Sequence, residues 1–291
     1  ADYRAFAAQI GITDFTCIPL SALRGDNMLE RSTASPWYTG KALMEHLESV
    51  AVDDDQASLP FRLPVQWVNR PNLDFRGYSG LIAGGSVKPG DRLRALPSGK
   101  EAIVSRLVTQ DGDLPLARAG QSITVTLDRE IDVSRGDVLV AAEQPSGVAD
   151  QFQATVIWMH EDAMLPGRPY LMKVGTRTVT ATLMTPKHKV NVNTLEHLAA
   201  RQLELNEIGV CTLSLDRPIA FDPYIENRET GGFILIDRLT NDTVGAGLLD
   251  YALRRADNIH WQALDVNRQA RSAQKGQKAC ALWFTGLSGS G

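Results

Sequence analysis

At 291 residues the chain is longer than one ordinary compact domain, so its length favours two domains, or three if some are partial. Hydrophobic residues make up 43% and charged residues 22%, close to the average for globular proteins, which excludes a disordered chain and a membrane protein. The formal net charge of -4 disfavours a protein that holds nucleic acid mainly by electrostatics.

Two further features of the sequence favour a cytoplasmic protein without membrane contact. No apolar run approaches the roughly 20 residues that span a bilayer, and the first residues lack the basic and apolar regions of a secretory signal. Cys17, Cys211 and Cys280 are far apart in apolar or strand-like stretches, which is typical of reduced thiols. We expect all three to be buried as small hydrophobic side chains.

Residues 1–50 have the pattern of the end of an α/β domain. An amphipathic helix is predicted over residues 2–10, closed by Gly11, and a buried strand over Phe15 to Leu20. Ser21-Ala22-Leu23 opens a loop, and apolar spacing from Leu43 to Val50 predicts a helix that starts near Gly40.

The acidic stretch from Asp53 to Asp55 predicts a solvated linker and a domain boundary. Beyond it, short alternating runs separated by turn residues predict a closed β-barrel over residues 59–144. The expected strands are Leu63 to Val68, Tyr78 to Ala83, Arg92 to Ala95, Ala102 to Val108, Ser122 to Leu127 and Val138 to Ala141.

A second series of short runs predicts a second barrel over residues 151–250, which does not repeat the first. Its expected strands are Phe152 to Met159, Tyr170 to Val174, Thr176 to Met184, Gly209 to Leu215, Gly232 to Asp237 and Thr243 to Leu249. Residues 251–278 are polar and basic with helical spacing, which favours a solvated helical linker over a nucleic-acid patch.

Residues 279–291 carry the sharpest motif in the sequence. The apolar run from Ala279 to Thr285 is typical of a buried parallel strand. It leads directly into a loop with the glycine spacing of a phosphate-binding loop, in which consecutive backbone N–H groups wrap a nucleotide phosphate: Gly286, Leu287, Ser288, Gly289, Ser290 and Gly291. A flexible Gly/Ser tail is the alternative interpretation.

The turn Ser21-Ala22-Leu23 is the second motif that could carry chemistry. A small turn at the carboxyl end of a strand can bring backbone amides against a guanine base, although a generic strand-to-loop turn fits the same residues. The histidines show no metal-ligand spacing, and no catalytic triad or carboxylate pair can be singled out. We therefore expect no metal site and no catalytic residue among the protein's side chains.

The order of these motifs resembles a known family. IPLSALRGDN (residues 18–27) and the following PWY (36–38) are similar to the last guanine-nucleotide motif and closing helix of the GTPase subunit of bacterial sulfate adenylyltransferase. FRGYSG (75–80), VKPGD (87–91) and RGDVL (135–139) resemble the second domain of that subunit and of elongation factor Tu. PGRPY (166–170), VGT (174–176) and TVGAG (243–247) resemble the third domain.

NIHWQ (258–262), GQK (276–278) and WFTGLSGSG (283–291) resemble the opening of an adenylylsulfate kinase. The resemblance covers essentially the whole chain and implies a multidomain, mainly β protein. Two translation-factor-type β-barrels would be flanked by the end of an α/β P-loop GTPase domain and by the first strand and phosphate loop of an α/β P-loop kinase domain. The expected boundaries are 1–50, 59–144, 151–250, 251–278 for the linker, and 279–291 for the kinase.

The resemblance implies sulfate activation. GTP hydrolysis would drive a small catalytic subunit to make adenylylsulfate from ATP and sulfate, and the fused kinase would make 3′-phosphoadenylylsulfate with ATP and Mg²⁺. Ser21, Ala22 and Leu23 would contact the guanine of GTP, and Gly286 to Gly291 would contact the phosphates of ATP.

Both ends of the sequence look cut. The other GTPase motifs would precede Ala1, and the lysine and hydroxyl of the kinase loop would follow Gly291. We therefore expect an interior fragment that is inactive by itself. Two alternatives stay open, a translation-type GTPase that binds tRNA and a non-catalytic interaction module.

Overall fold

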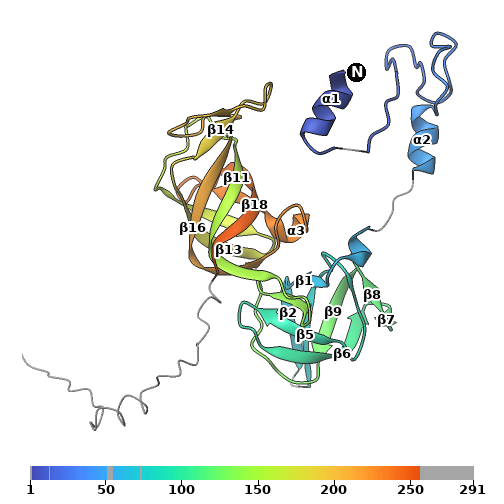
Figure 1. Cartoon of the computed structure of the whole chain (residues 1–291). Helices are drawn as coiled ribbons and strands as arrows, with labels where there is room; N and C mark the ends of the chain where they lie inside the picture. Colours follow the sequence, from blue (N-terminus) through green and yellow to red (C-terminus); the bar gives the residue numbers. More distant parts are fainter. Residues whose placement is uncertain (1, 13, 51–54, 73, 256–291) are drawn as a thin grey trace, which may run out of the picture. The chain divides into compact units, whose positions relative to one another are not determined.

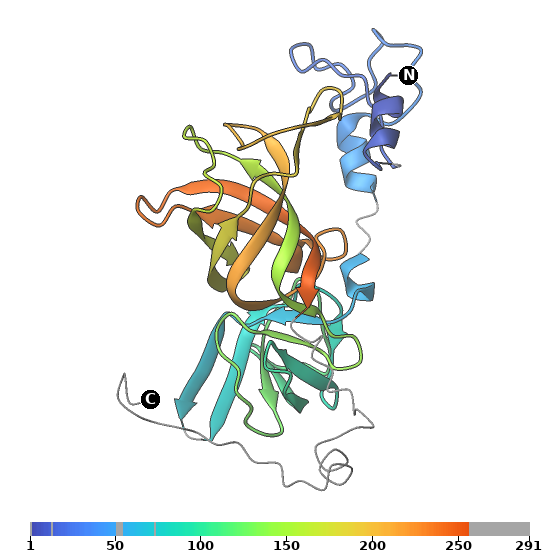
Figure 2. The same ribbon diagram turned by 60° about the vertical axis from the view of Figure 1, so that its left-hand side comes forward.

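The computed structural model describes residues 2–12, 14–50, 55–72 and 74–255 (Figure 1). The chain divides into two compact units, residues 1–55 and 56–291, which Figure 2 shows from a second side. The predicted helical linker over residues 251–278 is wrong for its first residues, because the strand β18 (Thr243–Arg255) continues through residues 251–255. The rest of that linker and the predicted kinase strand and loop lie outside the described residues. No helix of the described residues is long and apolar enough to cross a membrane.

The first unit contains the two predicted helices, α1 (Asp2–Gln9) and α2 (Leu43–Ser49). Gly11 follows α1 with a φ of +78°, and the Ile12 N–H donates to the Ala7 carbonyl at 2.9 Å. A residue in this left-handed conformation commonly ends a helix, and glycine adopts it without a steric penalty. Both helix predictions are confirmed, and α2 begins three residues after the expected Gly40.

The predicted buried strand from Phe15 to Leu20 is wrong for this structure. Residues 14–20 have no strand conformation, and their side chains are exposed or half-buried. A β-strand is stabilised by hydrogen bonds to a neighbouring strand. The described part of this unit offers none, because its β-pairing is limited to one isolated bridge between Ser21 and Asp26.

Residues 62–141 form barrel 1, which follows the short 3₁₀ helix η1 (Asp55–Ser58). Its strands run in the order β1-β10-β5-β6-β9-β3-β2, with β7 added to β6 and β4 paired with β8. The bounds are β1 Arg62–Pro64, β2 Trp67–Asn72, β3 Phe75–Leu81, β4 Ser86–Val87, β5 Arg92–Leu96, β6 Glu101–Thr109, β7 Gly112–Asp113, β8 Ala117–Arg118, β9 Ser122–Leu127 and β10 Val138–Ala141.

Barrel 1 closes where β1 continues into β2, because these two strands form the opposite ends of the sheet. Across the junction, Val65 N–H donates to the Asp137 carbonyl at 2.8 Å and Gln66 N–H donates to the Ser79 carbonyl at 2.8 Å. The predicted strand from Leu63 to Val68 is therefore divided by a bend. Alternate residues of the strands point inward and make the core, which includes Leu63, Leu93, Leu107, Val125 and Leu139.

Residues 147–255 form barrel 2, a closed ring of strands in the order β11-β18-β17-β12-β13-β16, with β16 pairing back to β11. The hairpin β14–β15 extends the sheet beyond β16. The bounds are β11 Gly147–Trp158, β12 Pro169–Val174, β13 Arg177–Leu183, β14 His188–Val190, β15 His197–Leu198, β16 Ile208–Phe221, α3 Arg228–Gly231, β17 Gly232–Ile236 and β18 Thr243–Arg255.

Aromatic side chains fill much of the core of barrel 2. Trp158 and Tyr170 are each 2% exposed and meet edge to face, with ring centroids 5.6 Å apart. The Trp158 indole N–H donates to the Asp162 carbonyl at 2.7 Å, so the buried ring leaves no polar group without a partner. The alternation of buried and half-buried residues along β11 is that of a strand with one face on a core.

The cysteines differ from one another in their surroundings. Cys211 lies in the core of barrel 2, as predicted, and burial raises the pKa of its thiol to about 12. Cys17 is exposed, so the prediction of a buried thiol is wrong there, because residues 14–20 do not form the expected strand. Cys280 lies outside the described residues.

This difference predicts selective thiol chemistry. The thiolate is the reactive species, so the native protein should be alkylated by iodoacetamide at Cys17 and not at Cys211. Peptide mapping by mass spectrometry measures both sites, and unfolding in guanidinium chloride should make Cys211 reactive. Labelling of Cys211 in the native state at the rate of Cys17 would contradict this assignment.

Candidate functional site

The predicted guanine-contacting residues lie in a tight turn of the first unit. Ser21 N–H donates to the Asp26 carbonyl at 3.2 Å, and Gly25 N–H donates to the Ser21 carbonyl at 2.8 Å. The Ser21 hydroxyl accepts from the Arg24 N–H at 3.3 Å, so this side chain stabilises the turn itself. Ala22 and Leu23 form the exposed tip, and Leu23 is 95% exposed.

The backbone N–H groups of Ala22 and Leu23 donate to no acceptor within the described part of the chain. Backbone N–H groups are obligatory hydrogen-bond donors and bind water or a ligand where no protein acceptor is present. The turn therefore offers two neighbouring donors, as a contact to a carbonyl oxygen of a base would require.

Asn27, which the sequence analysis did not single out, stabilises this turn through buried hydrogen bonds. Asn27 is 1% exposed, and its carboxamide forms hydrogen bonds to Pro19, Ser32 and Ser35. The signal available in the sequence is an asparagine next to Gly25 and Asp26, a cluster of residues that favours turns.

The other predicted site residues lie outside the described part of the chain. These are the loop glycines Gly286, Gly289 and Gly291 with Leu287, Ser288 and Ser290. The assignment of an ATP phosphate site to this loop therefore stays a prediction from the sequence.

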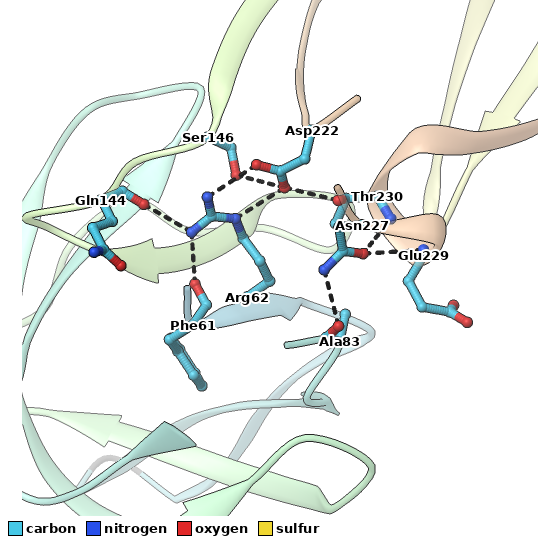
Figure 3. Close-up of polar contacts among 9 residues, drawn as sticks. All are labelled: Phe61, Arg62, Ala83, Gln144, Ser146, Asp222, Asn227, Glu229 and Thr230. Atoms are coloured by element: carbon cyan, nitrogen blue, oxygen red, sulfur yellow. Dashed lines mark hydrogen bonds and ion pairs between the residues drawn. The ribbon is translucent and has the colours of Figure 1, made fainter. Parts of the chain in front are cut away.

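A buried polar network joins the two barrels (Figure 3). The Arg62 guanidinium, on β1, donates to both oxygens of Asp222 at 2.9 Å, and the two residues are 5% and 6% exposed. Asp222 also accepts from the hydroxyls of Ser146 at 3.0 Å and Thr230 at 2.8 Å. The remaining Arg62 nitrogen donates to the carbonyls of Phe61 and Gln144.

Asn227 makes a second connection beside this ion pair (Figure 3). Its amide donates to the Ala83 carbonyl of barrel 1 at 2.9 Å, and its oxygen accepts from the N–H groups of Glu229 and Thr230 at the start of α3. One side chain therefore caps a helix turn of barrel 2 and binds the backbone of barrel 1.

Further contacts extend the junction between the barrels. The Thr176 hydroxyl donates to the Val65 carbonyl at 2.9 Å, and Arg177 pairs with Asp137 at 2.8 Å. An apolar cluster drawn from both barrels lies between them: Leu96, Val138, Val140, Val148 and Ala220. Sequence reasoning missed this junction, because the partners are up to 160 residues apart and no local pattern links them.

The histidine pair on β14 and β15 does not form a ligand site. His188 and His197 stack with ring centroids 3.8 Å apart and nearly parallel planes, so their nitrogen lone pairs do not converge on one point. Burial, followed by the charges of His197 and Lys187, lowers the pKa of His188. Among the described residues no group of three or more His, Cys, Asp or Glu side chains is placed to hold a metal ion.

A cleft of about 270 Å³ on barrel 1 is lined by several arginines. Arg76 pairs with Glu130 at 3.2 Å, and Arg106 donates to both oxygens of Asp113, at 2.6 and 2.9 Å. The lining also contains Arg129, and three carboxylates, those of Asp74, Asp128 and Glu130, balance the three guanidinium groups. The cleft therefore does not have the excess positive charge of an anion site.

The chain is similar to a protein family, to individual proteins in sequence, and to solved structures in fold. Residues 151–250 match the family described as GTP-eEF1A C-terminal domain-like. The bifunctional enzyme NodQ of Rhizobium meliloti (strain 1021) is 52% identical over 291 residues, which is 100% of this chain and 45% of that protein. The bifunctional enzyme CysN/CysC of Xylella fastidiosa (strain Temecula1) is 51% identical over 291 residues, 100% of this chain and 47% of that protein.

A shorter relative matches most of the same region. Sulfate adenylyltransferase subunit 1 of Aeromonas salmonicida (strain A449) is 46% identical over 288 residues, 92% of this chain and 61% of that protein. The chain thus spans about half the length of the bifunctional relatives.

Solved structures support the fold. The structure of sup35 complexed with GMPPNP has a TM-score of 0.64 at 21% identity, over 86% of this chain and 62% of that protein. This likeness establishes the fold, two β-barrels of the translation-factor type. The sequence identities establish the closer relationship: the chain is a homologue of the bifunctional NodQ and CysN/CysC enzymes and of sulfate adenylyltransferase subunit 1.

Proposed function

We propose that this chain is part of a sulfate-activating enzyme. In this proposal, GTP hydrolysis on the protein drives a small catalytic subunit to join ATP and sulfate into adenylylsulfate and pyrophosphate. A kinase domain then uses a second ATP, with Mg²⁺, to phosphorylate the 3′-hydroxyl. The observation that carries the proposal is the identity of 51–52% with bifunctional enzymes over all 291 residues, which include both barrels and both predicted nucleotide loops.

The nucleotide contacts follow the two loops. The turn at Ser21, Ala22 and Leu23 would bind the guanine of GTP, because it offers two backbone donors without protein acceptors among the described residues. The loop from Gly286 to Gly291 would wrap the phosphates of ATP with its backbone N–H groups. These assignments place a GTP contact and an ATP contact at opposite ends of the sequence.

The two barrels would position the small subunit and transmit to it a change at the nucleotide site. The buried Arg62–Asp222 pair and the Asn227 contact join them, so a force applied to one barrel moves the other with it. A conformational change at a nucleotide site would then displace the broad surface of both barrels. Many proteins use such a displacement to signal nucleotide hydrolysis to a partner. We propose that this surface carries much of the contact with the small subunit.

A translation-type GTPase that binds tRNA is the second candidate. The barrel fold supports it, but the fold is shared by proteins of different functions. A net charge of -4 gives little electrostatic support for binding an RNA backbone, and the relatives at 46–52% identity carry names of sulfate metabolism or of bifunctional enzymes.

We expect the full-length protein, mixed with its small subunit, to form adenylylsulfate from ATP and sulfate in a reaction that requires GTP hydrolysis. Pyrophosphate release measured with GTP, with a non-hydrolysable GTP analogue and without nucleotide tests this directly. Filter binding with tRNA on the same preparation serves as the control. Pyrophosphate release that is indifferent to GTP, together with tight tRNA binding, would favour the translation-type candidate.

We expect the tagged chain of 291 residues to retain the small subunit in a co-purification experiment, because it contains both barrels. Bovine serum albumin under the same conditions is the control for non-specific retention. A chain that is folded by circular dichroism and retains no small subunit would contradict the proposed role of the barrel surface.

The junction between the barrels should be sensitive to loss of one charge. Asp222→Ala leaves the Arg62 guanidinium buried without a counter-charge, so we expect a loss of about 3–5 kcal/mol in the free energy of unfolding measured in urea. The double variant Arg62→Met/Asp222→Leu should recover much of that loss, because it removes both charges. Asp113→Ala breaks an exposed pair and is the matched control. Equal stability of the Asp222 and Asp113 variants would show that the buried pair does not hold the barrels together.

A further inference from the structure

Asn27 combines burial, polarity and an unusual backbone conformation directly beside the Ser21–Gly25 turn. It is 1% exposed, and its φ is +55°. This left-handed conformation disfavours most L-residues, and asparagine is among the few that adopt it readily. An asparagine can therefore occupy this position and also place a carboxamide in the interior.

The Asn27 carboxamide fixes two neighbouring segments. Its nitrogen donates to the Pro19 carbonyl at 2.7 Å and to the Ser35 hydroxyl at 2.7 Å. Its oxygen accepts from the Ser32 N–H at 2.8 Å. Three of its four hydrogen-bonding positions are used, which is what a buried amide requires in order to be stable.

The backbone of Asn27 fixes a third segment. Its carbonyl accepts from the Leu43 N–H at 2.9 Å, and the next carbonyl, of Met28, accepts from the Met44 N–H at 3.0 Å. These donors belong to the first turn of α2, whose N-cap residue Ala42 provides no side-chain hydrogen bond. Asn27 thus connects the segment before the turn, the loop after it and the start of α2.

The Ser21–Gly25 turn is also held by Asp26, the residue next to Asn27. Ser21 N–H donates to the carbonyl of Asp26, and the Asp26 carboxylate accepts from the Ser32 hydroxyl. The position of the Ala22 and Leu23 donors therefore depends on residues 26 and 27 more directly than on any contact of their own side chains.

We infer that Asn27 is a positioning residue for guanine recognition: it holds the turn so that the Ala22 and Leu23 N–H groups face the O6 atom of the base. The inference rests on the proposed binding of GTP by this turn. Guanine presents an acceptor at O6, whereas a purine with an amino group at that position presents donors. Backbone donors held in place would favour guanine, and a displaced turn would lose that preference.

The test is the affinity of the full-length protein for GDP and for 2,6-diaminopurine riboside diphosphate, in which an amino group replaces O6. Asn27→Asp keeps the shape and the Ser32 contact but places an oxygen against the Pro19 carbonyl. We expect affinity for GDP to fall about tenfold, as for loss of a buried hydrogen bond, and affinity for the analogue to stay the same. Asn241→Asp is the matched control, because Asn241 also has a positive φ, of 64°, and lies exposed in barrel 2.

Ser35→Ala is a milder variant that removes one of the Asn27 contacts and should reduce the GDP preference in the same direction. Circular dichroism checks that each variant is folded. An unchanged GDP affinity in both the Asn27 and Ser35 variants would overturn the inference, and so would an equal fall for GDP and the analogue. If the wild-type protein binds no GDP, the proposed guanine site fails, and the inference fails with it.

Discussion

The buried ion pair between Arg62 and Asp222 is the interaction on which the arrangement of the two barrels depends. Taking two charges out of water is costly, and the cost is offset here because every group has partners: both Asp222 oxygens bind Arg62, and the hydroxyls of Ser146 and Thr230 complete the site (Figure 3). Such a pair tolerates one geometry. It therefore specifies how barrel 2 sits on barrel 1 more strictly than the small apolar cluster beside it.

A fixed junction has a consequence for the proposed function. Each barrel is closed, barrel 1 at the bend between β1 and β2 and barrel 2 by pairing of β11 with β16, so neither can deform without breaking its ladder. We propose that the two closed barrels, joined by this buried network, move as one body. In a protein driven by GTP hydrolysis, a rigid pair of barrels would transmit a displacement that begins at the nucleotide to a distant partner, because the barrels themselves would not deform.

Periodicity predicted the strands well because it reflects a local constraint: alternate residues of β5, β6 and β11 must face a core. The same reasoning missed the elements that are too short to show a period: β4, β7, β8, β14, β15 and α3. It was wrong about residues 15–20, because strand formation needs a neighbour that the described part of the first unit does not supply. At the candidate guanine turn it identified Ser21 to Leu23 but not Asn27, whose role appears only when its contacts to Pro19, Ser32 and Ser35 are seen.

The sequence by itself determined the mainly β character, the two series of strands and the resemblance to sulfate-activating GTPase subunits, since these depend on residue order and local pattern. Only the tertiary structure decided which strands close each barrel, that Arg62 meets Asp222, and that Cys17 is exposed. The physical reason is separation along the chain. A contact between residues 160 positions apart leaves no local pattern, because each partner only needs to suit the place where the folded chain brings the other.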